Sequence, residues 1–265
     1  MHSPNNRLRK REPRYVITAA VILVCLLVAA VLYVVYFGTQ TMFVLESRYM
    51  ARKVPILNMK PIELQDLTSS SVAGKKLSYF GYEFEVPWSD LDESATKIYP
   101  DHVLLTFGSG PRLRFVSAPP REFVNAILSS GKDPDSLRQL YGKEAFDSDY
   151  AFVHLMLNTT PEEITMRTPQ RDVVGRSMML TFKAIAVPSA DTEMFSIHNQ
   201  DFKGFQYGNP QSKPKRVVVD LYADDGGLEF VFYGKDNTLN ISQPEINRVI
   251  QTARKTKSSN DSMTR

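Results

Sequence analysis

The stretch 215-KRVVVDLYADDGGLEFVFYGK-235 consists of two runs of alternating residues on either side of a turn. Asp224, Asp225, Gly226 and Gly227 are residue types that a tight hairpin turn favours. The apolar residues that fall on one face of the two runs are Val217, Val219, Leu221, Leu228, Phe230 and Phe232. Because a period of two is that of a strand with one buried face, the stretch predicts an antiparallel β-hairpin.

Four further segments carry a strand pattern. The segment 102-HVLLTFGSGPRLRFVSA-118 predicts a second hairpin, because Leu113 and Phe115 alternate with arginines after a Gly-Ser-Gly-Pro turn. The segment 77-LSYFGYEFEVPW-88 predicts one half-buried strand that stops at Pro87, with Trp88 closing one end of the core. Two short aromatic strands are expected at 194-MFSIHN-199 and 202-FKGFQYGN-209.

Helices are expected between and after these strands, with ends set by proline, glycine and capping residues. The expected helical segments are 121–131, 134–141, 149–158, 169–187 and 244–255. The run from Thr160 to Glu163 has capping-box spacing and predicts one more helix start. The segment 60-KPIELQDL-67 predicts a short helix before a polar linker. In 169–187 the residues at helical spacing, expected to pack inward, are Val173, Val174, Ser177, Met178, Thr181, Ala184 and Ile185.

Strands, helices, strands and a final helix follow one another without regular βαβ alternation. This order predicts an α+β fold, in which one domain with an antiparallel sheet, containing two clear hairpins, is packed by several helices. A single N-terminal transmembrane helix is expected to precede that domain.

The predicted transmembrane helix lies in 7-RLRKREPRYVITAAVILVCLLVAAVLYVVYFG-38. Residues 15–37 carry no charge, and as a helix they would extend about 34 Å, enough to cross a hydrocarbon core about 30 Å thick. A cleaved secretory signal has a shorter apolar core and a small-x-small site, whereas Ala29-Ala30 is followed by more apolar residues. A lipoprotein signal places a small residue before its cysteine, whereas Val24 precedes Cys25. The sequence therefore favours a retained signal-anchor.

Basic residues cluster before the span, in residues 7–14, which predicts a cytoplasmic N-terminus and an extracytoplasmic domain. The expected organisation is a cytoplasmic basic tail at 1–14, the transmembrane helix at 15–37, a juxtamembrane segment and linker at 38–76, an α+β domain at 77–255 and a disordered tail at 256–265. The expected location is the cell inner membrane, with the domain in the periplasm if the cell is Gram-negative.

The net charge of +3 belongs to the tail. The chain has 32 basic and 29 acidic residues, and residues 1–14 account for five and one of them, so 27 and 28 remain, a net charge of −1. Nucleic-acid binding requires a basic face, and no nucleic-acid partner is expected. Cys25 is the only cysteine, so the domain has no disulfide, thiolate nucleophile or cysteine zinc site.

No catalytic, cofactor-binding or metal-binding residue is predicted, and no cofactor is expected. The chain lacks a G-x-S-x-G elbow, an H-E-x-x-H motif and a phosphate-binding loop. Ser109 lies in an expected turn. The carboxylate pairs 90–92 and 147–149 lack the glycine and glutamate that complete a calcium loop. His102 with Asp90 or Asp92 is the first place to look for a site that forms only in the fold.

The other two histidines of the domain, His154 and His198, fall in an expected helix and an expected strand. His154 is interpreted as a packing residue because its neighbours are apolar. The expected function is that of a single-pass membrane protein that contacts the lipid bilayer through residues 15–37 and binds a protein partner in the cell envelope without catalysis. The alternative is an anchored extracytoplasmic enzyme, a hydrolase.

Overall fold

The computed structural model describes residues 13–64, 68–71, 74–109, 111–129, 133–188, 192–212, 214–234 and 239–256, with the backbone alone for 13–21, 35 and 36. Most of the predicted tails, at 1–14 and 256–265, lies outside these residues.

The strands are β1 Ile62–Glu63, β2 Lys75–Tyr79, β3 Tyr82–Val86, β4 Lys97–Ile98, β5 His102–Thr106, β6 Arg112–Ala118, β7 Met194–His198, β8 Lys203–Tyr207, β9 Arg216–Ala223, β10 Gly226–Tyr233 and β11 Arg254–Lys255. The α-helices are α1 Pro13–Lys53, α2 Glu122–Leu128, α3 Pro134–Tyr141, α4 Asp149–Asn158, α5 Gln170–Ala186 and α6 Gln243–Thr252. Short 3-10 turns are η1 Pro55–Asn58, η2 Glu144–Phe146, η3 Pro161–Glu163 and η4 Pro210–Ser212.

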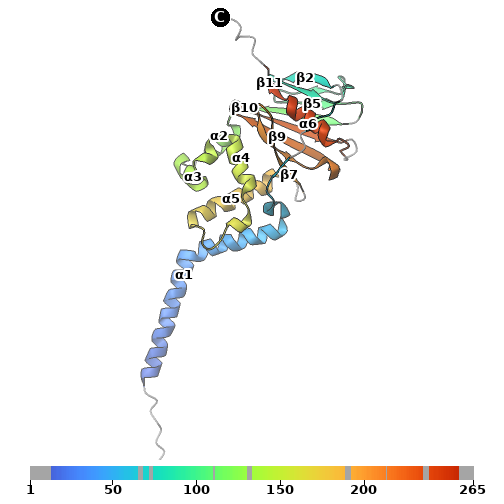
Figure 1. Cartoon of the computed structure of the whole chain (residues 1–265). Helices are drawn as coiled ribbons and strands as arrows, with labels where there is room; N and C mark the ends of the chain where they lie inside the picture. The colour runs from blue at the N-terminus through green and yellow to red at the C-terminus, as the bar shows by residue number, and fades with distance from the viewer. Residues whose placement is uncertain are drawn as a thin grey trace, which may run out of the picture.

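These elements form a mixed α+β fold around a mostly antiparallel sheet (Figure 1). The eight-stranded sheet has the order β1-β7-β8-β9-β10-β6-β5-β4, and a smaller sheet has the order β11-β3-β2. Only β1 and β7, among the described strands, pair in parallel. The predicted hairpin at 215–235 is confirmed as β9 and β10, and that at 102–118 as β5 and β6.

The large sheet separates two hydrophobic cores. The small sheet and α6 cover one face, and helices α2 to α5 lie on the other, as Figure 1 shows. Strand β9 supplies both cores, since Val217 and Val219 face the small sheet while Val218 faces the helices. Trp88 closes the first core as predicted, with its ring 5.1 Å from that of Phe107 and its Nε1 donating to Glu245 Oε1 at 3.0 Å.

The N-terminal segments contribute to the helical core. The second half of α1 packs along α5, and Val44, Ile56 and Leu57 are buried in that core. Residues of the expected juxtamembrane segment therefore pack against residues of the expected domain.

Several local predictions are wrong. The expected helix at 244–255 ends at Thr252, because Arg254–Lys255 forms strand β11. The expected single strand at 77–88 contains a hairpin, because Phe80 and Gly81 adopt left-handed φ angles of 51° and 81° and reverse the chain between β2 and β3. The expected helix at 60–67 contains strand β1, which pairs with β7. The run from Thr160 to Glu163 forms only the turn η3, and the Thr160 side chain makes no capping bond.

The helix α1 bends as it leaves the domain. Its first half points away from the other elements, and its large apolar side chains between Ile22 and Val34 are 50–66% exposed (Figure 1). In the described part of the chain no single helix is both long and apolar enough to cross a membrane. Ile22–Val34 and Phe37–Lys53 reach the required length and composition only as a pair, with a bend of 58° between them.

Candidate functional site

The first sequence candidate, His102 with Asp90 or Asp92, does not come together. His102 Nδ1 lies 2.8 Å from Asp101 Oδ1, and its ring stacks on that of Tyr99 with 4.3 Å between centroids. The backbone nitrogen of Asp92 bonds to the carbonyl of Thr106, at the other end of β5. The two ends of β5, His102 and Thr106, are four residue steps apart, which is about 13 Å along a strand.

Asp90 and Asp92 instead stabilise turns. Asp90 accepts hydrogen bonds from the backbone nitrogen and the hydroxyl of Ser109. Asp92 Oδ1 accepts from the backbone nitrogens of Ser94, at 3.0 Å, and Ala95, at 3.1 Å. Both carboxylates accept hydrogen bonds from backbone donors of neighbouring turns, which is the role expected of aspartate in tight turns.

The remaining candidates also have local roles. Asp149 Oδ1 accepts from the backbone nitrogen of Val124 at 2.8 Å at the start of α2, and Ser148 caps α4. His198 is exposed at the end of β7. His154 is exposed on α4, and its ring lies against those of Tyr150 and Phe205, with 5.6 Å and 6.3 Å between centroids, in keeping with a packing role. Within the described ranges, no group of three or more His, Cys, Asp or Glu side chains is placed to hold a metal ion.

Lys183 on α5 is a buried polar residue that the sequence analysis missed. The expected inward stripe of α5 ended at Ile185, which is 78% exposed, whereas Lys183 is fully buried. Its Nζ donates to three backbone carbonyls, those of Met59 at 2.5 Å, Leu157 at 2.7 Å and Thr159 at 3.1 Å. Carbonyls at the end of α4 have no partner within the helix, and a cation there is favoured by the helix dipole.

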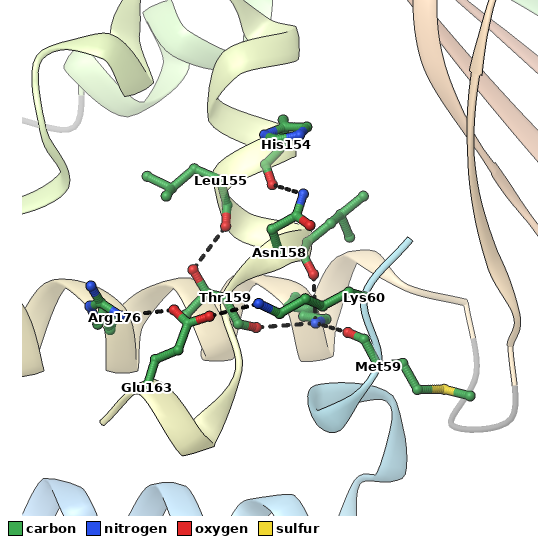
Figure 2. Close-up of polar contacts among 10 residues, drawn as sticks. Met59, Lys60, His154, Leu155, Asn158, Thr159, Glu163 and Arg176 are labelled. Atoms are coloured by element: carbon green, nitrogen blue, oxygen red, sulfur yellow. Dashed lines mark hydrogen bonds and ion pairs between the residues drawn. The ribbon is translucent and has the colours of Figure 1, made fainter. Parts of the chain in front are cut away.

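The surroundings of Lys183 set its pKa. Burial and, to a smaller extent, the nearby Lys60 together lower the pKa of the Lys183 ammonium to about 8, while Glu163 acts in the opposite direction. Glu163 lies between two cations, 2.9 Å from Lys60 Nζ and 2.8 Å from Arg176 Nη1 (Figure 2). All three donors of Lys183 are occupied by the backbone. Lys183 thus links α5 to the ends of η1 and α4, and its role is structural.

A second polar cluster lies on the helix-covered face of the large sheet. Asp220 on β9 pairs in register with Glu229 on β10, so two carboxyl groups sit directly opposite each other. Tyr207 and Tyr222 lie close enough to the Asp220 carboxyl group for their hydroxyls to affect its pKa. We call these four residues the acid–tyrosine cluster.

Burial and, to a smaller extent, the Glu229 carboxylate together raise the pKa of Asp220 to about 7, while Tyr207 and Tyr222 act in the opposite direction. Burial also raises the pKa of Tyr207 and of Tyr222 well above the ordinary tyrosine value. Near neutral pH the Asp220 carboxyl group therefore exists in both protonation states, while the two hydroxyls keep their protons. Such a carboxyl group can give or take a proton at physiological pH.

The acid–tyrosine cluster lies near two surface hollows. Tyr222 lines a hollow of about 300 Å³ together with Tyr150 and Lys203. Tyr207 lines another of about 700 Å³ together with Glu193 and other polar residues. A carboxyl group with a shifted pKa close to surface pockets is typical of a binding site. The acid–tyrosine cluster is therefore the candidate site.

Comparison with known proteins finds no matching family model, no matching curated protein and no matching solved structure.

Proposed function

We propose that the protein is a single-pass membrane protein of the cell inner membrane whose α+β domain lies outside the cytoplasm and binds a protein partner of the envelope. The observation that carries the proposal is the first half of α1. Its large apolar side chains over Ile22–Val34 are largely exposed, and this half points away from the domain (Figure 1). An isolated apolar helix is disfavoured in water, and lipid covers it without a partner.

The basic residues before the apolar run support a cytoplasmic N-terminus, as the rule for short basic flanks requires. A non-catalytic role is supported by the contacts of the candidate residues. His102 is stacked and paired, Asp90 and Asp92 stabilise turns, and Lys183 holds three carbonyls. The two hollows beside the acid–tyrosine cluster offer polar and aromatic surface to a partner.

The membrane topology is tested with two reporters fused after Arg265 in the full chain. We expect an alkaline phosphatase fusion to be active, because that enzyme matures only outside the cytoplasm, and a green fluorescent protein fusion to be dark. The reverse pattern would contradict the proposed orientation. Carbonate extraction tests the anchor: the native chain should stay in the membrane pellet, whereas a Leu26→Lys, Val28→Lys variant should be released.

Partner binding is tested by photo-crosslinking in intact cells. A photoreactive residue replaces Lys203 at the smaller hollow or Arg216 at the larger one, and Ile98 on the distant edge strand β4 serves as the control position. We expect a discrete adduct from one hollow position and none from the control. Equal, diffuse labelling from all three positions would argue against a docking surface at the hollows.

The second candidate function is an anchored extracytoplasmic hydrolase, and the raised pKa of Asp220 favours it, since a carboxyl group that titrates near 7 suits acid–base work. The detergent-solubilised full chain is assayed with p-nitrophenyl esters and phosphates. Turnover that disappears in Asp220→Asn while the chain stays folded would favour the enzyme. Turnover that is unchanged in this variant would remove Asp220 from consideration.

A further inference from the structure

The second half of α1, residues Phe37–Lys53, has two faces of different character. The inner face packs on α5 and η3, and Gln40, Val44 and Ser47 are buried there. Gln40 Nε2 donates to the carbonyls of Met166 at 3.0 Å and Thr168 at 2.6 Å. This face holds the helix to the domain.

The outer face of the same segment is apolar and largely exposed. Met42, Leu45 and Tyr49 recur at helical spacing and are 56%, 61% and 63% exposed. Met166 is also exposed and lies next to this helix, since the Thr41 hydroxyl is 3.8 Å from its sulfur. Large apolar side chains grouped on one exposed face are typical of a surface that contacts a protein partner or a membrane.

Basic side chains flank the apolar stripe. Arg48, Arg52 and Lys53 are exposed, and Glu46 is the one acidic residue of this segment. Lys53 Nζ lies 5.9 Å from the centre of the Tyr49 ring. A helix with an apolar stripe, a tyrosine and flanking cations is typical of one that lies in the interface of a membrane with anionic lipids.

The bend in α1 directs this outer face toward a membrane that contains the first half. Figure 1 shows the domain on one side of the second half, while the first half leaves on the other side. The bend is 58°, so an upright span leaves the second half about 32° from the membrane plane (90° − 58°). Transmembrane helices tilt by up to about 40°, and a tilt in that range lays the second half flat.

We propose that Phe37–Lys53 lies in the headgroup region of the membrane that the first half of α1 crosses. Met42, Leu45 and Tyr49 enter the acyl boundary, and Arg48, Arg52 and Lys53 contact the phosphates of anionic lipids. The proposal rests on the proposed membrane anchor and adds how the domain stands on the bilayer. The Gln40 bonds then fix the segment 165–168 at the membrane surface, with Met166 facing the lipid.

The test measures immersion depth at three single cysteines in the full chain, reconstituted in vesicles of phosphatidylethanolamine and phosphatidylglycerol. Native Cys25 reports on the span. Leu45→Cys and Ile98→Cys, each combined with Cys25→Ser, report on the outer face and on the edge of the sheet. A spin label at each site is challenged with oxygen, which enters lipid, and with a water-soluble nickel chelate.

We expect the ratio of oxygen to nickel accessibility to be highest at Cys25 and lowest at Ile98. At position 45 the ratio should be several-fold higher than at position 98. If the label at position 45 is as accessible to nickel as the label at position 98, while Cys25 is in lipid, the proposal of an interfacial helix is wrong. The proposed membrane anchor would still stand. Nickel access at both Cys25 and Leu45 would overturn both proposals. Spin–spin coupling between Leu45 labels of two copies, persisting in lipid-free detergent, would assign the face to a dimer instead.

The lipid charge is tested with Arg48→Gln, Arg52→Gln in the Leu45→Cys background. We expect the Leu45 label to lose part of its oxygen-to-nickel ratio in anionic vesicles and to change little in phosphatidylcholine. The matched control is Arg138→Gln, an exposed arginine on α3 that should leave the ratio unchanged. Equal ratios with and without the two arginines in anionic vesicles would contradict the contacts with lipid phosphates.

Discussion

Lys183 is a residue at which burial and charge oppose each other. Its ammonium group is removed from water, which lowers its pKa to about 8 from the usual 10.5. The three carbonyls that it binds, of Met59, Leu157 and Thr159, would have no donor in its absence. An acceptor left unpaired in a buried position costs about 1–3 kcal/mol, so the junction is stabilising even though the charge alone is not.

We expect Lys183→Met to lower the free energy of unfolding by about 2–4 kcal/mol at neutral pH, because several buried carbonyls lose their donor. Urea unfolding followed by circular dichroism measures it. The control Lys60→Met removes a neighbouring exposed cation and should change stability by less than about 1 kcal/mol. A loss equal to that of the control would show that the three carbonyls find other partners.

The same residue predicts a rise in stability at alkaline pH. Between pH 8 and 10.5 the unfolded chain holds the Lys183 proton while the folded chain releases it. Unfolding free energy therefore rises with pH across this window, by up to about 3 kcal/mol. The difference between the native chain and Lys183→Met should follow this rise. A difference that is flat from pH 8 to 10.5 would mean that the folded pKa is not lowered.

Asp220 predicts the opposite trend at lower pH. Its folded pKa of about 7 lies above its ordinary 3.8, so the folded chain holds the proton more tightly. This contribution to stability is fully present below pH 3.8 and is lost as pH rises through about 7, a loss of about 2–4 kcal/mol. Asp220→Asn, which cannot ionise, should remove this trend, whereas the exposed control Asp135→Asn should keep it. Parallel stability curves for the native chain and Asp220→Asn would contradict the raised pKa.

At the scale of elements, α3 and α5 approach each other closely at Gly175. A Cβ atom built on Gly175 would lie 2.2 Å from the carbonyl oxygen of Leu140, a contact that requires the helices to separate. We expect Gly175→Ala to destabilise the fold by about 1–3 kcal/mol, despite the helix-propensity gain of about 1 kcal/mol. The matched control is Gly38→Ala in α1, where the nearest atom, in Val34, is 3.6 Å away. Thermal unfolding that ranks the two variants equally would contradict the close approach.

Elements were predictable where their signals are local. The hairpins at 102–118 and 215–235 follow from alternation and turn residues a few positions apart, and the expected helix at 134–141 is confirmed as α3, capped by Asp133. Strand β1 was missed because its partner β7 is far away in the sequence and no local pattern specifies a two-residue parallel pairing. The Phe80-Gly81 turn was missed because aromatic residues continue across it.

The candidate site was unpredictable for the same reason. Asp220 alternates with Val219 and Leu221, so the sequence indicates a polar strand face without indicating that helices cover it. Lys183 could have been suspected from its helical spacing with Val173 and Leu180, both buried, but its three acceptors come from elements fixed only in the fold. Local patterns set the faces of strands and helices, and contacts distant in sequence set which polar groups become buried.

At the scale of the whole molecule, the position where the folded unit begins is testable. A chain starting at Gly38 retains the inner face of α1, whereas a chain starting at Lys60 loses the buried Val44, Ile56 and Leu57. We expect the first to unfold at the same temperature as the detergent-solubilised full chain and the second to be destabilised by more than about 5 kcal/mol, since each large buried side chain contributes about 2–5 kcal/mol. Equal stability would support the predicted linker at 38–76.

The continuous helix from the apolar half of α1 into the core also limits where the domain can go. A flexible linker lets a tethered domain search a volume that grows with linker length. Here the helix passes directly into the packing against α5, with Gln40 bonded across the join. If the first half lies in a bilayer, as we propose, the domain keeps one height and one tilt, and its hollows stay at a nearly constant distance from the membrane. A partner must present its own surface at that distance, which favours proteins held in the same membrane over those that diffuse freely.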